Sequence, residues 1–283
     1  MREEIKEICR QLEQEKGIKI IFAVESGSRA WRLNSKDSDY DVRFVFVRPM
    51  EEYLKINERD EVIISCYDEQ GNKHPQEGCF IDMEGFDIFK FSRMLSSSNP
   101  TVIEWLQSDI LYYGNKPQCW LDRLDNKINF LSLYFHYKSM CKANYVKYLK
   151  SGNDVTYKKY LYAMRGLVNA KWIVEYKMLP KINFSDTISE INPLEEAKID
   201  TNQFRHAIKE VVPVFILKRL GDIIFLKTCG REKDIVENDT YIDMCIENFL
   251  KDDSDAPESN RILETYTDLN EEILKQILQS RSK

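Results

Sequence analysis

Several features that define common protein classes are scarce or missing in this sequence of 283 residues. It has only ten glycines and eight prolines and shows no internal repeat, which excludes collagen-like and low-complexity chains. No uninterrupted apolar run approaches the ~18 residues that a membrane-spanning helix needs. What remains, with 43% hydrophobic and 31% charged residues, is the composition of a globular protein long enough for about two domains.

Metal-binding and disulfide patterns are also missing. The seven cysteines form no CxxC pair and are odd in number, which favours reduced thiols over a zinc site or a disulfide framework. The three histidines do not cluster, so we expect none to be a ligand. The first 17 residues have the spacing of an amphipathic helix and not of an export signal, so the expected location is the cytoplasm.

Charge is distributed unevenly along the chain. The formal net charge is −6, yet the stretch 136–181 contains ten Lys and Arg against two acids and carries +8, which leaves −14 for the rest. Tyrosines interleave with the lysines of this stretch. Such a basic block in an acidic protein can attract phosphate groups locally, and aromatic rings beside cations can stack on bases.

Hydrophobic periodicity divides the chain into two parts. Short β-branched runs predict strands at 18–24, 41–47, 61–67 and 79–84, the last two forming a hairpin. Helical spacing predicts helices at 1–17, 29–33, 87–95, 101–107, 121–149, 157–176, 200–220 and 263–280, with a polar loop at 252–260. We therefore expect an α+β fold, with a mixed-sheet domain at 1–116 and an all-helical domain at 117–283.

A phosphate-binding turn is predicted where the first strand turns into a helix. Gly27 and Ser28 stand at this point, where backbone N–H groups and the serine hydroxyl can hold a triphosphate. Arg29 lies beside this turn and Arg43 beside the aspartates of the next strand, so we expect each to clamp the substrate or the local structure; the alternative is a pairing with surface carboxylates. Trp31 is expected to be a packing residue.

Two aspartates at the start of the second strand predict a metal site. Asp39 and Asp41 are one residue apart, so both side chains project from the same face of the strand. Two such carboxylates would repel one another without a divalent cation, and hard oxygen ligands suit Mg²⁺. A third acid would complete a two-metal arrangement; we choose Asp82, inside the fourth strand, over Asp87, which is equally well placed to cap the next helix.

One helix of the basic stretch offers a second contact surface for a nucleotide. Lys158, Tyr162 and Arg165 share a helical face, with Lys159 beside them. The alternative is a solvated basic face, which is common on any helix. We expect these four residues to contact the phosphates or the base of a nucleotide or RNA.

The quoted residues resemble a known family. A glycine-serine turn followed by Ser38, Asp39, Tyr40 and Asp41 is similar to the signature of the DNA polymerase beta nucleotidyltransferase superfamily, and the closer resemblance is to its RNA-repair-associated, YcgL-like branch. That branch also resembles the chain in the segments 85–87, 99–106 and 158–165. In this sequence Arg32 stands where the family pattern usually has glycine.

The resemblance implies a polymerase-beta-type nucleotidyltransferase domain and a magnesium-dependent reaction. Two Mg²⁺ ions, or Mn²⁺ in their place, would be held by Asp39, Asp41 and the third carboxylate, while an NTP such as ATP gives up its nucleotide to a hydroxyl group and pyrophosphate leaves. The branch implies an RNA 3′ end as the acceptor. Two other readings stay open: nucleotidylation of a protein or small-molecule hydroxyl, and a nucleotide-binding module without turnover, which Arg32 motivates.

Overall fold

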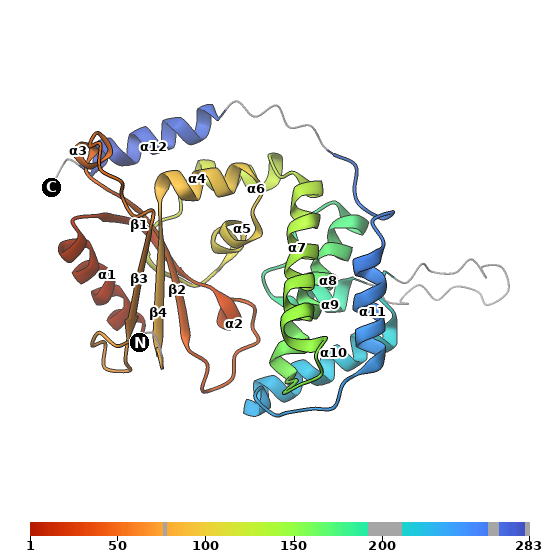
Figure 1. The fold of residues 1–283 in the computed structure, drawn as a ribbon. Helices are drawn as coiled ribbons and strands as arrows, with labels where there is room; N and C mark the ends of the chain where they lie inside the picture. The colour runs from red at the N-terminus through yellow and green to blue at the C-terminus, as the bar shows by residue number, and fades with distance from the viewer. Residues whose placement is uncertain (76–77, 192–210, 260–265, 281–283) are drawn as a thin grey trace. The chain divides into compact units, whose positions relative to one another are not determined.

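A five-stranded mixed sheet forms the centre of the N-terminal part of the computed structural model (Figure 1), which describes residues 1–75, 78–191, 211–259 and 266–280. The strand order is β3-β4-β2-β1-β5. The strands are β1 (Lys19–Glu25), β2 (Tyr40–Val47), β3 (Val62–Tyr67), β4 (Ile81–Asp87) and β5 (Leu111–Gly114). Only the β2–β4 pair is parallel; the β1–β2, β1–β5 and β3–β4 pairs are antiparallel.

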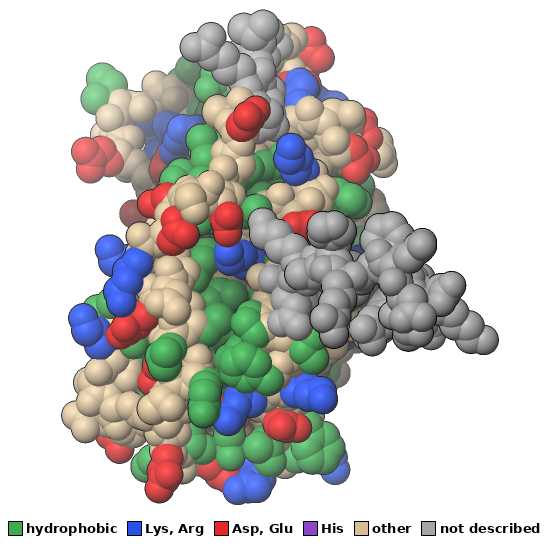
Figure 2. Space-filling model, turned by 90° about the vertical axis from the view of Figure 1, so that its right-hand side faces the viewer, with side chains coloured by type: hydrophobic (Ala, Val, Ile, Leu, Met, Phe, Trp, Pro, Cys, Tyr) green, Lys and Arg blue, Asp and Glu red, His purple; other side chains and the backbone are tan. Residues whose placement is uncertain are grey.

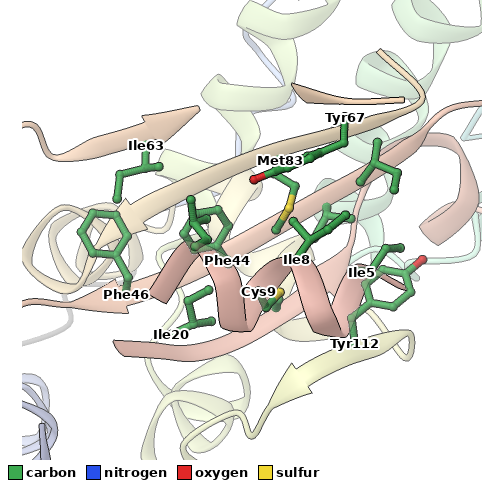
Figure 3. Packing of buried hydrophobic residues seen from close by; sticks show 14 of the residues in the cluster. Ile5, Ile8, Cys9, Ile20, Phe44, Phe46, Ile63, Tyr67, Met83 and Tyr112 are labelled. Atoms are coloured by element: carbon green, nitrogen blue, oxygen red, sulfur yellow. The ribbon is translucent and has the colours of Figure 1, made fainter. Parts of the chain in front are cut away.

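One face of the sheet is covered by α1 (Arg2–Lys16), whose apolar side buries Ile5, Ile8, Cys9 and Leu12. These side chains pack against alternate residues of the strands, among them Phe44 of β2 (Figure 3). The cluster explains why 18–24 and 41–47 fold as strands, because every second side chain finds apolar surface there.

Aromatic residues fill the other face of the sheet. The helices here are α4 (Ile88–Ser96), α5 (Pro100–Gln107) and α6 (Gln118–Asn126). Phe22 of β1 meets Phe91 of α4 and Trp120 of α6 edge to face, and Phe91 stacks near Trp105 of α5. Two short helices, α2 (Gly27–Ala30) and α3 (Met50–Tyr53), follow β1 and β2.

Helices make up the C-terminal part of the chain as far as it is described. They are α7 (Phe130–Asn144), the π-helix η1 (Tyr145–Leu149), α8 (Tyr157–Tyr176), α9 (Phe184–Glu190), α10 (Val214–Leu226), the π-helix η2 (Lys227–Arg231), α11 (Thr240–Lys251) and α12 (Thr267–Gln279). The helices α7 and α8 cross closely at Gly166, where a Cβ would come within 2.8 Å of the backbone of Tyr137 and Cys141. Glycine at this position is what allows the approach.

The chain divides into two compact units. Unit 1 holds the described residues of 1–30 and 38–129 together with α12, and unit 2 holds those of 31–37 and 130–259. The predicted domains, 1–116 and 117–283, do not coincide with these units, because α6 and α12 belong with the sheet and the segment 31–37 belongs with the helices. The α+β class and the mixed sheet are confirmed.

Three helix predictions differ from the structure. The brief helix expected at 29–33 lies at Gly27–Ala30, since Arg32 adopts a left-handed φ of 59° and cannot continue it. The helix expected at 121–149 is broken between α6 and α7, where the Asn129 N–H donates to the Ser98 hydroxyl. Residues 192–210 lie outside the described part of the chain. Of the helix predicted at 200–220, only residues 214–220 can be compared with α10.

The expectation that all seven thiols are reduced fails at one pair. Cys66 of β3 and Cys79, two residues before β4, are joined by a disulfide with their Cα atoms 5.5 Å apart. Because β3 and β4 are antiparallel, the segment just before β4 lies beside the end of β3, and the cysteine spacing alone does not reveal this proximity. The other five cysteines are free.

Within the described ranges, no helix is both long enough and apolar enough to cross a membrane. Figure 2 looks at the side of unit 2 that carries α11, where hydrophobic side chains lie among charged ones. A cavity of about 400 Å³ opens in unit 2 between α8, α10 and α11. It is lined chiefly by apolar residues such as Leu167, Ile216 and Phe249.

Candidate active site

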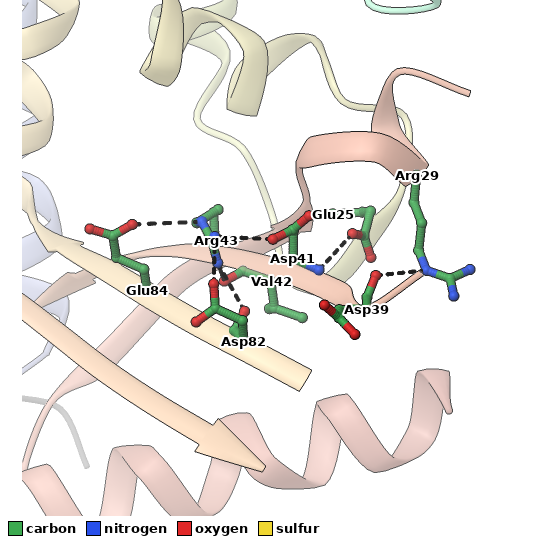
Figure 4. Close-up of polar contacts among 8 residues, drawn as sticks. All are labelled: Glu25, Arg29, Asp39, Asp41, Val42, Arg43, Asp82 and Glu84. Atoms are coloured by element: carbon green, nitrogen blue, oxygen red, sulfur yellow. Dashed lines mark hydrogen bonds and ion pairs between the residues drawn. The ribbon is translucent and has the colours of Figure 1, made fainter. Parts of the chain in front are cut away.

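Four charged side chains from β2 and β4 share one face of the sheet (Figure 4). In the parallel register, Asp41 lies opposite Asp82 and Arg43 opposite Glu84. Side chains alternate along each strand, and Val42 and Phe44 point to the α1 face, so these four residues project from the opposite face. The structure therefore brings Asp82, the preferred third carboxylate, next to Asp41.

The turn after β1 is built around the Asp41 carboxylate. Gly27 has a φ of 57°, in the left-handed region that favours glycine. A Cβ on Gly27 would overlap the carboxylate of Asp41, so glycine is the residue that fits at this point of the turn. Ser28 follows in α2 and is buried. The predicted phosphate turn thus lies directly against one of the predicted metal ligands.

Arg43 is engaged by the carboxylates around it. Its Nη2 lies 3.2 Å from Asp41 Oδ1 and 2.8 Å from Asp82 Oδ2, and its Nε lies 3.7 Å from Glu84 Oε2. Its Nη1 donates to the backbone carbonyls of Val42 and Asp82, at 3.0 and 2.9 Å. The Arg43 side chain is only 15% exposed. In this conformation a guanidinium neutralises the carboxylate cluster.

A buried glutamate that the sequence analysis did not single out binds the backbone of Asp41. Glu25, the last residue of β1, accepts a hydrogen bond of 2.9 Å from the Asp41 N–H and another from the Tyr112 hydroxyl of β5. The Ser108 hydroxyl donates to the Glu25 carbonyl at 2.6 Å. Burial raises the pKa of Glu25 to about 7. A carboxylate ending a buried apolar strand was the one sequence signal for this role.

Arg29 closes the loop between α2 and β2. Its Nε and Nη2 donate to the carbonyls of Asp39 and Ser38, at 3.1 and 2.6 Å, and its guanidinium lies 3.8 Å from the centre of the Tyr40 ring. Asp39 is exposed, one residue before β2. Figure 4 shows Asp39 beside Arg29, whereas Arg43 lies among Asp41, Asp82 and Glu84. Of the two roles considered for Arg29, the contacts seen are those of a structural clamp.

Asp87, the alternative third carboxylate, caps a helix. It precedes α4, accepts a hydrogen bond of 2.9 Å from the Phe89 N–H and another of 2.9 Å from the Tyr53 hydroxyl. Its side chain is 3% exposed and lies 4.0 Å from Arg48, and burial raises its pKa. The predicted capping role of Asp87 is confirmed, and its contacts lie at the opposite end of β4 from Asp82.

The fit of these residues to a divalent cation can be judged from the donor set. Asp41 and Asp82 offer hard oxygen atoms that are both in contact with one nitrogen atom of Arg43, a spacing that a single cation can bridge. In the described residues, no group of three His, Cys, Asp or Glu side chains is arranged to hold a metal ion together. Two of the three predicted ligands are therefore assembled, and Asp39 is not arranged with them.

The predicted contact residues of α8 belong to unit 2 and have partners there. The guanidinium of Arg165 lies 3.6 Å from the centre of the Trp31 ring, and Arg165 is 3% exposed. Tyr162 meets Trp31 edge to face, and Lys158 lies over the Tyr162 ring. Lys159 donates to the Asp154 carbonyl at 2.6 Å. The face is not simply solvated, and a nucleotide-binding role for these four residues stays a prediction.

The sequence matches a known protein family over most of its length. The model of the RNA repair pathway DNA polymerase beta family matches residues 1–208. The chain belongs to this family, which is of the polymerase-beta nucleotidyltransferase type.

Two individual proteins are similar to the chain. An uncharacterized protein, YcgL of Bacillus subtilis strain 168, is 35% identical over 204 residues, which is 71% of this chain and 74% of that protein. A solved structure of a nucleotidyltransferase-like protein from Exiguobacterium sibiricum 255-15 covers 99% of this chain and 81% of its own, at 11% identity. Its TM-score is 0.30.

Proposed function

We propose that the protein transfers a nucleoside monophosphate from an NTP such as ATP to a hydroxyl group, with an RNA 3′ end as acceptor and Mg²⁺, or Mn²⁺, as cofactor. The observation that carries the proposal is the pairing of Asp41 with Asp82 on adjacent parallel strands, directly beside the Gly27 turn. A bound divalent cation supplies charge neutralisation at the triphosphate and activates the attacking hydroxyl. Membership of the RNA repair pathway family supports the choice of acceptor.

Each residue of the site has a distinct part in this proposal. Asp41 and Asp82 would hold the cation, and Asp39, which is not arranged with them in the structure, is the third ligand that the proposal keeps from the sequence. Gly27 and Ser28 receive the phosphates at the turn, where Gly27 lets the chain pass close to the Asp41 carboxylate. The +8 stretch of unit 2, with Lys158, Lys159, Tyr162 and Arg165, attracts the polyanionic substrate.

The test incubates the full chain with Mg²⁺, each α-labelled NTP in turn, and either RNA or protein as acceptor. We expect label in RNA, and an at least ~100-fold loss with Asp41→Asn or Asp82→Asn, since each removes a charged oxygen ligand. Label in protein would replace the proposed acceptor. No label in any acceptor would overturn the transferase proposal.

Two further variants make this test specific. Asp122→Asn on α6 alters an exposed carboxylate of the same unit and should leave transfer unchanged. Asp87→Asn should retain transfer, because its amide oxygen can still accept the hydrogen bond from the Phe89 N–H that caps α4. If Asp87→Asn is inactive and Asp82→Asn is active, the assignment of the third carboxylate is wrong.

A nucleotide-binding module without turnover is the second candidate. It is favoured by the fact that Arg43 bridges Asp41 and Asp82, while Asp39 is not arranged with them. Equilibrium binding of labelled NTP without transfer, in the presence of Mg²⁺ and RNA, would support it.

A further inference from the structure

The nitrogen atom that joins the two central carboxylates belongs to an arginine. One atom, Arg43 Nη2, is within 3.2 Å of Asp41 Oδ1 and 2.8 Å of Asp82 Oδ2. A cation bound between Asp41 Oδ1 and Asp82 Oδ2 would lie in the position that Nη2 holds. An arginine and a divalent ion cannot occupy that place together, because both are positively charged and both need those lone pairs.

We propose that Arg43 is an internal counter-ion that competes with the divalent cation, so that metal binding requires Arg43 to release Asp41 and Asp82. The proposal rests on the proposed function, since it concerns the same two carboxylates. It assigns Arg43 to the regulation of metal binding, in place of the direct contact with the nucleotide expected from the sequence.

Glu84 is a second carboxylate partner that can neutralise Arg43 after it leaves Asp41 and Asp82. Glu84 stands opposite Arg43 in the β2–β4 register, and its Oε2 is already 3.7 Å from Arg43 Nε. Glu84 is 35% exposed, so it can keep the guanidinium paired while Nη2 leaves the two aspartates. The Arg43 side chain is only 15% exposed. Without Glu84, its release from the two aspartates would leave a largely buried positive charge unpaired, which is energetically costly.

Arg43 also accounts for how three carboxylates can lie together on one face of the sheet. Asp41, Asp82 and Glu84 project from one face of two adjacent strands, and like charges at this distance destabilise a fold. Arg43 contacts all three and is fixed to the backbone by its Nη1. The positive charge therefore holds the carboxylates together until a cation of higher charge replaces it.

The first experiment measures Mn²⁺ binding to the metal-free full chain, without nucleotide, by electron paramagnetic resonance of the free ion. Arg43→Gln should bind Mn²⁺ at least ten-fold more tightly than the wild type, because it removes the competing charge. Arg93→Gln, which breaks the exposed Arg93–Glu61 pair, makes the same charge change on unit 1 and should bind as the wild type does. Equal or weaker binding by Arg43→Gln overturns the proposal.

The second experiment uses the wild type and so does not depend on the folding of a variant. In arginine labelled with ¹⁵N, the Arg43 Nε–H signal, identified by its loss in Arg43→Lys, should shift in a saturable way as Mg²⁺ is added. The Arg93 signal should not move. A stationary Arg43 signal, at Mg²⁺ concentrations that saturate binding, contradicts release.

The two proposals fail in different ways. If Arg43→Gln binds Mn²⁺ more tightly and no nucleotide is transferred, the competition stands and the transferase proposal falls. If transfer depends on Mg²⁺ and Arg43→Gln binds Mn²⁺ no more tightly, the transferase stands and the competition falls. Absence of Mn²⁺ binding by both proteins overturns the competition.

Discussion

Two arginines, one in each unit, are kept largely from water in different ways. Arg43 in unit 1 is 15% exposed and lies among three carboxylates from β2 and β4. Arg165 in unit 2 is 3% exposed and lies over the indole ring of Trp31. The first is held by charge and can exchange that charge for another cation. The second is held by an aromatic face, which a dissolved ion does not displace.

The comparison shows what a buried positive charge can do in each setting. Among carboxylates, an arginine takes part in an equilibrium that metal and pH can shift. On an aromatic ring, the same side chain contributes packing and orientation. Both residues were predicted to contact a nucleotide, since the sequence gives the charge and not its surroundings.

The largest effect is expected from reversal of the charge on Arg165, which tests whether this side chain is buried against the Trp31 ring. Arg165→Glu places a carboxylate in a buried position over the Trp31 ring, which should lower the free energy of unfolding by about 3–5 kcal/mol. Lys158→Glu is the control, because Lys158 lies on the same helix and is partly exposed. It should lower the free energy of unfolding by less than about 1 kcal/mol. Urea unfolding checks both; an unchanged midpoint for Arg165→Glu would mean that Arg165 is not held as described.

The pH dependence of the free energy of unfolding tests the buried carboxyl group of Glu25, which lies beside the carboxylate cluster of unit 1. The pKa of Glu25 is 4.5 in its ordinary state and about 7 when buried beside Asp41, so the folded state favours the protonated form. The contribution of the protonated Glu25 carboxyl to the free energy of unfolding is fully present below pH 4.5 and is lost as the pH rises through 7. Glu25→Gln should therefore gain about 3 kcal/mol relative to the wild type between pH 4 and pH 8.

The measurement is urea unfolding at the two pH values with a chelator present. Glu13→Gln is the matched control, because Glu13 also accepts hydrogen bonds from a backbone N–H, that of Ile20, and from a tyrosine, Tyr113. Its response to pH is subtracted from that of Glu25→Gln. A residual difference near zero would show that the Glu25 carboxyl is not desolvated as the structure has it.

The smallest effect is expected at Arg32, the residue that departs from the family pattern. Its φ of 59° is one that glycine adopts without strain. Arg32→Gly should stabilise the fold by about 0.5 kcal/mol, since relief of strain exceeds the added entropy of the unfolded chain. Arg32→Ala removes the charge and keeps the strain, so it should give no gain. Thermal melting distinguishes the two variants; an equal gain from both would assign the effect to charge.

Local patterns predicted most of the elements that carry the site. The strands β1 to β4 and the helix α8 were placed within a few residues, because each has a clear apolar period. The strand β5 was missed, since its four residues show no period and its only reason to be extended is pairing with β1. The helix α11 was also missed, although its N-cap, Asp239, is visible in the sequence.

The chemistry of the site was predictable only in part. The spacing of Gly27, Asp39 and Asp41 marked its position, and the contact between Gly27 and Asp41 gives that spacing a steric reason. The pairing of Arg43 with Asp82 could not be predicted, because it depends on a parallel register between residues 39 positions apart. The same holds for Glu25, whose partner Tyr112 comes from β5.

The last described helix has a consequence for synthesis of the chain on the ribosome. Arg123 of α6 is 2% exposed, and its carboxylate partner is Asp268 of α12, 2.8 Å away. Unit 1 therefore contains a nearly inaccessible guanidinium whose partner emerges only after all of unit 2 has been made. Domains commonly fold in order of synthesis. Here the unit that begins first is completed last, and premature termination before α12 would leave that charge without its carboxylate inside the unit that bears the site.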